Sequence, residues 1–307
     1  MTRHFLRDDD ITAAEQADIL SLAGRMKEQR FEHRLLEGPQ TVAVIFDKSS
    51  TRTRVSFAVG IADLGGAPLI ISTASSQLGG KETPADTARV LERMVAAIVW
   101  RTYGQDGLEE MADGTSVPVV NALSDDFHPC QLLADLLTMR EKFGSLEGRI
   151  VCFSGDGRSN MAQSYLLACA TAGMHVRIAC PAGFSPRADV VADAERLALQ
   201  TGGSIRVGSD PQELVAGADA VVTDTWVSMG KEDEKVQRVK TFTPYQVTEA
   251  LMAKAKPAAL FMHCLPADRG FEVEASVIDG PQSVIWDQSE NRLHAQKALL
   301  AWLLQRA

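Results

Sequence analysis

The sequence predicts an α/β protein of two domains, each a parallel sheet flanked by helices, with the active site in the cleft between them. Its 307 residues exceed the size at which a single core usually stops growing, so two domains of about 150 residues each are expected. Short apolar runs of strand length alternate with segments of helical period along the chain. That alternation is typical of parallel sheets covered on both faces.

The first half begins with a helix whose start is marked by its capping residues. Thr12 and Glu15 have the capping-box spacing, and the helical period continues to about Gln29. Four strands are then predicted, and two more helix starts carry a proline at the first helical position. The strands are 41–46, 69–72, 97–100 and 117–120, and the helix starts are Thr83-Pro84 and His128-Pro129.

The second half continues the alternation after an amphipathic stretch at 131–143, which we expect to bridge the two sheets. The final stretch, 291–304, is helical by its period and could pack on either domain. The five strands predicted in this half are 150–153, 176–179, 220–223, 259–262 and 284–285.

Composition excludes several classes of protein. A net charge of -9 without a Lys/Arg-rich run argues against nucleic acid as a partner. No apolar stretch approaches the roughly 18 to 20 residues of a membrane span, and the start lacks a signal-peptide apolar region, so we expect a cytoplasmic protein. Five cysteines, an odd number without a CxxC pair, argue against a disulfide scaffold or a zinc ribbon.

Polar and ionisable residues follow almost every predicted strand. Ligands of open parallel sheets bind beyond the carboxyl ends of the strands, so these segments are the candidate ligand contacts. The segments are 48–54, 75–81, Arg101, 128–131, 155–160, 224–230 and 263–266.

The run Lys48-Ser-Ser-Thr-Arg-Thr-Arg54 is typical of an anion-binding loop. It follows a buried strand and leads into a helix, where free backbone N–H groups, hydroxyls and guanidinium groups suit a phosphate or carboxylate. Its cations, Lys48, Arg52 and Arg54, together with Arg101, concentrate positive charge in an acidic chain. The run lacks the P-loop frame, so an anion other than a nucleoside triphosphate is expected. A solvated helix cap with surface arginines is the alternative.

The segment Gly155-Asp-Gly-Arg-Ser-Asn160 resembles a dinucleotide-binding turn only in part. It follows a strand and opens a helix, but Asn160 replaces the third glycine, which argues against a pyrophosphate site. His128, His263 and Cys264 also follow strands. Neither His128 with Cys130 nor His263 with Cys264 has the spacing of a zinc site, so no metal is predicted, and each of these residues could simply be a packed residue.

Four motifs in order resemble the aspartate/ornithine carbamoyltransferase family, and within it the ornithine carbamoyltransferases. They are STRTR at 50–54, HPCQ at 128–131, Asp224 with SMG at 228–230, and HCLP at 263–266. The resemblance covers nearly the whole chain. It implies a carbamoyl phosphate-binding domain at 1–132, onto which the C-terminal helix 291–307 packs back, an ornithine-binding domain at 133–290, and a homotrimer with shared active sites.

The resemblance also implies a role for each matching residue. The phosphate is held by Ser50, Thr51, Arg52, Thr53 and Arg101, and Gln77 reaches in from a neighbouring subunit. The carbamoyl end is contacted by His128, Gln131, Arg292 and the Cys264-Leu265 backbone. Ornithine is bound by Asn160, Asp224, Ser228 and Met229, and Cys264 lies beside its attacking δ-amine.

The implied reaction transfers the carbamoyl group to the δ-amine of L-ornithine, giving L-citrulline and phosphate, without a metal or organic cofactor. Negative charge builds on the carbamoyl oxygen and on the leaving phosphate, where Arg101, His128 and Thr53 supply charge and donors. The amine, with a reference pKa of about 10.4, must first lose a proton, which Asp224 and Cys264 could accept or relay.

Two positions depart from the family pattern, and other functions stay open. Asp268 stands where an aromatic residue or histidine is expected, and Ser159 where asparagine is expected. Another acceptor is the first alternative: aspartate, although no base precedes Lys231 in this segment to hold a second carboxylate, or else putrescine or acetylornithine. An NAD-dependent oxidoreductase and a non-catalytic binding protein are the others. The sequence leaves undecided whether the enzyme serves arginine synthesis, which we favour, or arginine breakdown.

Overall fold

The computed structural model describes residues 2–73, 78, 81–227 and 232–306. These residues form two compact units, one of residues 1–137 with 289–307 (unit 1) and one of residues 138–288 (unit 2). The division falls inside α5 (Pro129–Phe143), and α12 (Ile285–Leu304) begins just before the chain returns to unit 1. None of the described helices is long and apolar enough to cross a membrane.

Unit 1 contains a four-stranded, all-parallel sheet in the order β2-β1-β3-β4. Five of the six residues of β1 are buried, among them Val42, Val44 and Ile45, as expected of a central strand covered on both faces. Its elements are α1 (Ala13–Glu28), β1 (Thr41–Phe46), α2 (Thr51–Asp63), β2 (Ala67–Ser72), α3 (Pro84–Leu91), β3 (Ala97–Arg101), α4 (Gln105–Asp113), β4 (Val119–Leu123) and the parts of α5 and α12 assigned above.

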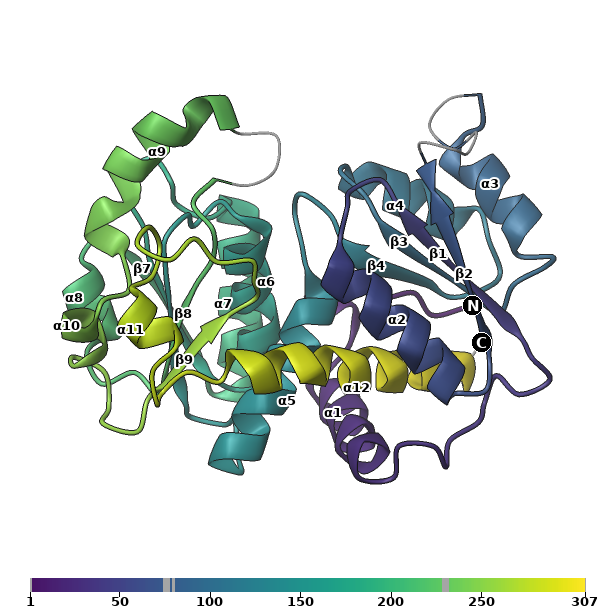
Figure 1. Cartoon of the computed structure of the whole chain (residues 1–307), viewed down its shortest axis with the longest axis horizontal. Helices are drawn as coiled ribbons and strands as arrows, with labels where there is room; N and C mark the ends of the chain where they lie inside the picture. Colours follow the sequence, from purple (N-terminus) through teal and green to yellow (C-terminus); the bar gives the residue numbers. More distant parts are fainter. Residues whose placement is uncertain (1, 74–77, 79–80, 228–231, 307) are drawn as a thin grey trace. The chain divides into compact units, whose positions relative to one another are not determined.

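Helices cover both faces of this sheet. Ile45 and Trp100 pack with buried residues of α3 and α4 in one apolar cluster. On the other side, α2 lies alongside α12 (Figure 1), and a Cβ on Gly60 would come within 3.4 Å of Leu293. A Cβ at this position would make only ordinary van der Waals contacts, so α2 and α12 pack against each other at Gly60.

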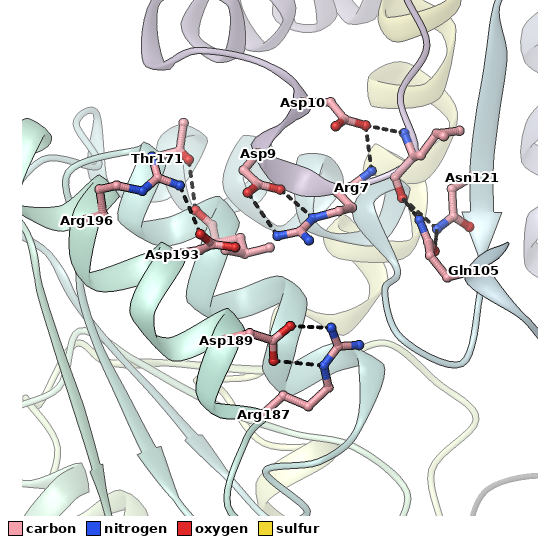
Figure 2. A network of polar contacts seen from close by, with 12 residues as sticks. Arg7, Asp9, Asp10, Gln105, Asn121, Thr171, Arg187, Asp189, Asp193 and Arg196 are labelled. Atoms are coloured by element: carbon pink, nitrogen blue, oxygen red, sulfur yellow. Dashed lines mark hydrogen bonds and ion pairs between the residues drawn. The ribbon is translucent and has the colours of Figure 1, made fainter. Parts of the chain in front are cut away.

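The segment before α1 is tied to β4 by polar contacts (Figure 2). Asp10 accepts hydrogen bonds from the backbone N–H groups of Leu6 and Arg7 at 2.6 and 2.8 Å, and the Leu6 carbonyl accepts from Asn121 at 2.9 Å and Gln105 at 3.3 Å. These contacts satisfy backbone groups that lie outside any helix or sheet.

Unit 2 contains a five-stranded, all-parallel sheet in the order β7-β6-β5-β8-β9. Helices α6 and α7 pack together on it, while α8, α10 and α11 contribute to a separate apolar cluster with Cys152, Val221 and Phe261. Its elements are β5 (Ile150–Ser154), α6 (Asn160–Thr171), β6 (His175–Ala179), α7 (Ala188–Thr201), β7 (Ser204–Gly208), α8 (Pro211–Val215), β8 (Ala220–Thr223), α9 (Lys235–Phe242), α10 (Glu249–Met252), β9 (Leu260–His263) and α11 (Ala275–Ile278).

The predicted class, two parallel sheets flanked by helices, is confirmed, and individual elements need correction. The predicted strand at 284–285 is wrong: Ser283 forms one isolated bridge with Phe261, and Ile285 already begins α12. Strand β4 begins only at Val119, because Pro118 has no N–H to give, although its carbonyl accepts from Ile98. Strand β7 was not predicted.

Candidate active site

The N-terminus of α2 in unit 1 is built to receive an anion. Ser50 caps the helix, its hydroxyl accepting from the Thr53 backbone N–H at 3.2 Å, and Thr51 is the exposed first residue of the helix. The guanidinium of Arg52 is half-buried and makes no hydrogen bond or ion pair with any residue that the structure describes. A helix N-terminus with an uncommitted arginine offers both dipole and charge to a phosphate.

The other two cations of the 48–54 run, Lys48 and Arg54, contact other side chains of the protein, which the sequence did not predict. Lys48 is buried, contacts the carboxylate of Asp125 and lies 4.3 Å from the Tyr103 ring centroid. Arg54 lies 5.1 Å from the centroid of Phe46. Arg52 is therefore the arginine of this run that is free to bind a ligand.

Arg292 of α12 joins α2 to α5 within unit 1. It is 2% exposed, and its guanidinium donates to Thr53 at 3.2 Å, Gln131 at 2.5 Å and Gln296 at 2.8 Å. Gln131 in turn donates to Asp135 at 2.8 Å. These bonds fix the side chains of Thr53 and Gln131, both of which the resemblance assigns to carbamoyl phosphate.

His128 lies among three arginines. Burial lowers the pKa of His128 well below its usual value, and the positive charges of Arg292, Arg101 and Arg52 lower it further. The imidazole is therefore neutral at pH 7. Arg101 ends β3, where β4 has one extra residue opposite the pair Trp100 and Arg101, a bulge of the kind that re-aims side chains beside functional sites.

In unit 2, Asp224 and Cys264 meet because they follow neighbouring strands. Thr223 of β8 is in register with His263 of β9, so the next residues of both strands leave the sheet side by side. The Cys264 thiol donates to Asp224 Oδ1 at 3.1 Å. Burial raises the pKa of Asp224, while the hydrogen bonds from Cys264 and from the Thr225 N–H act against that rise.

A buried pair, His263 and Glu272, supports the turn that carries Cys264. His263 Nδ1 accepts from the Leu265 N–H at 2.8 Å, which leaves Nε2 to donate to Glu272 at 3.3 Å. Leu265 has a φ of 59°, a conformation that costs a non-glycine residue energy, and the bond to His263 helps to hold it. Glu272 also accepts from the Asp268 N–H at 2.6 Å. Sequence reasoning missed Glu272.

Asp224, His263 and Cys264 place possible metal-ligand atoms within 4.8 Å of one another. From the sequence, neither His128 with Cys130 nor His263 with Cys264 has the spacing of zinc ligands, and Asp224 was not grouped with them. A metal-free site stays a prediction here.

The 155–160 turn leads to Asn160, the first residue of α6. Gly155 has a φ of 147°, and a Cβ on Gly157 would lie 2.6 Å from the Phe184 carbonyl oxygen, so both positions require glycine. Ser159, one of the two departures from the family pattern, caps α6 by accepting from Ala162 N at 3.2 Å. Three predicted ligands, Gln77, Ser228 and Met229, lie outside the described residues.

Comparisons with known proteins agree on one family. Residues 3–141 match the carbamoyl-P binding domain of aspartate/ornithine carbamoyltransferase, and residues 147–303 match the Asp/Orn binding domain of the same family. The chain is 72% identical to the ornithine carbamoyltransferase of Clavibacter sepedonicus, with 100% of each chain covered.

Solved structures give the same result. The ornithine carbamoyltransferase of Pyrococcus furiosus has a TM-score of 0.95 and 47% identity, covering 100% of this chain and 98% of that one. The anabolic ornithine carbamoyltransferase of Campylobacter jejuni has a TM-score of 0.93 and 37% identity, covering 99% and 100%.

Proposed function

Because the chain belongs to the aspartate/ornithine carbamoyltransferase family, we propose that it transfers the carbamoyl group of carbamoyl phosphate to the δ-amine of L-ornithine, giving L-citrulline and phosphate. The observation that carries the proposal is the N-terminus of α2, where the uncommitted guanidinium of Arg52 lies beside Thr53, which Arg292 holds by a hydrogen bond of 3.2 Å. Such a set of fixed positive groups matches a small, doubly charged phosphate ester or anhydride.

At the phosphate end, the free guanidinium of Arg52 and the N–H groups of α2 bind the phosphoryl oxygens. Ser50 and Thr51 add hydroxyls at the same helix end, and Arg101 adds a second charge. Since these charges are in place before reaction, the leaving phosphate is stabilised without reorganisation of the site.

At the carbamoyl end, Gln131 and Arg292 hold the planar group while His128, being neutral, donates a hydrogen bond to the oxygen on which charge develops. A neutral imidazole has one N–H to donate, and the surrounding arginines keep it from taking up a second proton. The same groups would line up the carbamoyl carbon for attack, which is a large part of the acceleration in a two-substrate reaction.

At the amine end, Asp224 and Cys264 receive the δ-ammonium group of ornithine. A carboxylate with a raised pKa is a better proton acceptor than an ordinary one, and its bond to the Cys264 thiol gives a short path for the proton. Asn160 then binds the amino-acid end. The carboxylate of Asp224 favours an acceptor with an ammonium group over aspartate.

Assembly and context are also proposals. Seven of the ten exposed large hydrophobic side chains among the described residues belong to unit 1, including Val55, Leu69 and Met94, which supports contacts between copies through this unit in a homotrimer. A role in arginine biosynthesis fits the anabolic relative. Independence from metals and organic cofactors, and a cytoplasmic location, stay predictions.

The test is an acceptor panel with purified protein and carbamoyl phosphate. Ornithine, aspartate, putrescine and acetylornithine are compared by phosphate release and by identification of the carbamoylated product. Citrulline from ornithine, with little product from the others, is the expected result. Product from another acceptor with no citrulline would overturn the proposal.

A further inference from the structure

Arg238 of α9 is a buried cation whose partners come from three separate segments of unit 2. It is 5% exposed, and its guanidinium donates to the backbone carbonyl of Trp226, to the carboxylate of Asp156 and, at 3.3 Å, to Glu234. Asp156 is 7% exposed. A buried ion pair is a costly way to gain stability, so its placement calls for a reason other than stability.

Aromatic rings fix the plane of this guanidinium. Its central carbon lies 5.1 Å from the ring centroid of Phe242 and 5.6 Å from that of Phe184, and these two rings pack edge to face at 4.8 Å. Trp226 stacks on Phe242 at 6.1 Å. A planar, multidentate cation suits this environment, and a lysine ammonium would not reproduce its geometry.

Both main partners of Arg238 belong to segments that carry ornithine ligands in the proposed function. Asp156 uses one carboxylate oxygen for Arg238 and the other for the Arg158 N–H at 2.9 Å, which shapes the turn that leads to Asn160. Trp226 is two residues after Asp224. One guanidinium therefore joins the segment of Asn160 to the segment of Asp224.

We propose that the Arg238–Asp156 pair positions the acceptor amino acid, by holding the Asn160 and Asp224 segments at a fixed separation. The inference rests on the proposed function and adds two residues that do not themselves touch substrate. Since an error of about 1 Å in the placement of a substrate can cost a hundredfold in rate, loss of this pair should weaken ornithine use selectively.

The test compares two carboxylates of unit 2. Asp156→Asn leaves one acceptor oxygen for two donors, so either Arg238 or the Arg158 N–H loses its partner. Asp219→Asn is the matched control: Asp219 is 3% exposed and accepts from Arg149 at 3.1 Å and Lys256 at 2.8 Å, but it precedes β8, at the opposite end of the sheet from Asp224.

We expect Asp156→Asn to raise the KM for ornithine about tenfold or more while the KM for carbamoyl phosphate changes less than about twofold. Asp219→Asn should lower the unfolding temperature and leave both KM values within about twofold. Arg238→Lys, which keeps the charge but loses the planar contacts, should reproduce the ornithine effect and serves if Asp156→Asn does not fold.

An unchanged ornithine KM in either the Asp156 or the Arg238 variant would overturn the positioning role, and so would an equal rise in the Asp219 control. Wild-type protein that forms no citrulline would instead overturn the proposed function itself. The two failures are therefore distinguishable in one set of assays.

Discussion

Replacing Arg52 by alanine tests the anion site most directly. Arg52 is the second residue of α2, and its guanidinium is half-buried with no hydrogen bond or ion pair to any described residue. Its removal therefore breaks no internal contact in the part of the chain that the structure describes. The cost should appear in ligand binding and hardly at all in stability.

The size of the effect follows from the interaction that is lost. A hydrogen bond to a charged partner contributes about 1.5 to 3 kcal/mol, and a bidentate guanidinium–phosphate contact lies at the upper end. With about 1.4 kcal/mol for each factor of ten, Arg52→Ala should weaken carbamoyl phosphate binding by about ten- to a hundredfold. The KM for ornithine should change less than about threefold.

Arg54→Ala is the matched control, since it removes the same charge two residues along the helix. Arg54 is exposed and lies 5.1 Å from the Phe46 ring centroid, so its loss leaves the helix N-terminus unchanged. The measurements are the KM for carbamoyl phosphate, the KM for ornithine, and inhibition by inorganic phosphate. If Arg52→Ala and Arg54→Ala raise the carbamoyl phosphate KM equally, or if Arg52→Ala affects ornithine as strongly, the 48–54 run is structural and the reasoning is refuted.

Three further predictions concern the chemistry and the stability of the fold. Cys264→Ala should lower kcat by about a hundredfold if the thiol relays the amine proton, and unchanged turnover at saturating substrate would remove it from the mechanism. Because the pKa of His128 is lowered in the folded protein, the unfolded chain binds a proton at acid pH that the folded chain does not. The free energy of unfolding should therefore fall as the pH drops below about 6.5, and it should fall less steeply in His128→Gln. Denaturant titrations of both proteins at pH 7 and pH 5 measure this difference. Lys297→Met should cost about 3 kcal/mol of unfolding free energy in the same titration at pH 7, because Lys297 donates to the Arg30 carbonyl at 2.8 Å and to Asp63 at 3.4 Å; a wild-type midpoint would contradict this.

Local signals explain what could be predicted of the fold. The strand at 41–46 and the helix starts at Thr12 and Thr83 can be recognised from residues that lie close together in the sequence, and the structure has each element at the predicted place. Strand β7 was missed because it lies at the sheet edge and has no fully buried residue, so its apolar pattern is weak. The strand predicted at 284–285 failed because two apolar residues fit a helix start equally well.

The candidate site divides in the same way. Ser50 to Thr53 are contiguous, so their chemistry is readable in one motif. The side chains that stabilise the site are not contiguous in the sequence. Ser56 forms a hydrogen bond with Gln296, 240 residues later in the chain, and Asp156 pairs with Arg238, 82 residues later. In the sequence, Gln296 and Arg238 look like polar residues on helix surfaces, and only the packing of distant segments gives them partners.

Unit 1 is assembled from the two ends of the chain, and this affects how it can fold during synthesis. Residues 138–288 are continuous, so unit 2 has its whole sequence available as soon as residue 288 has been made. Residues 1–137 emerge earlier but lack Arg292 and Lys297, whose bonds reach Thr53, Gln131 and the carbonyls near the end of α1. The first part of the chain to be translated is therefore the last to be completed, and a nascent chain that stops short of α12 has no finished anion site.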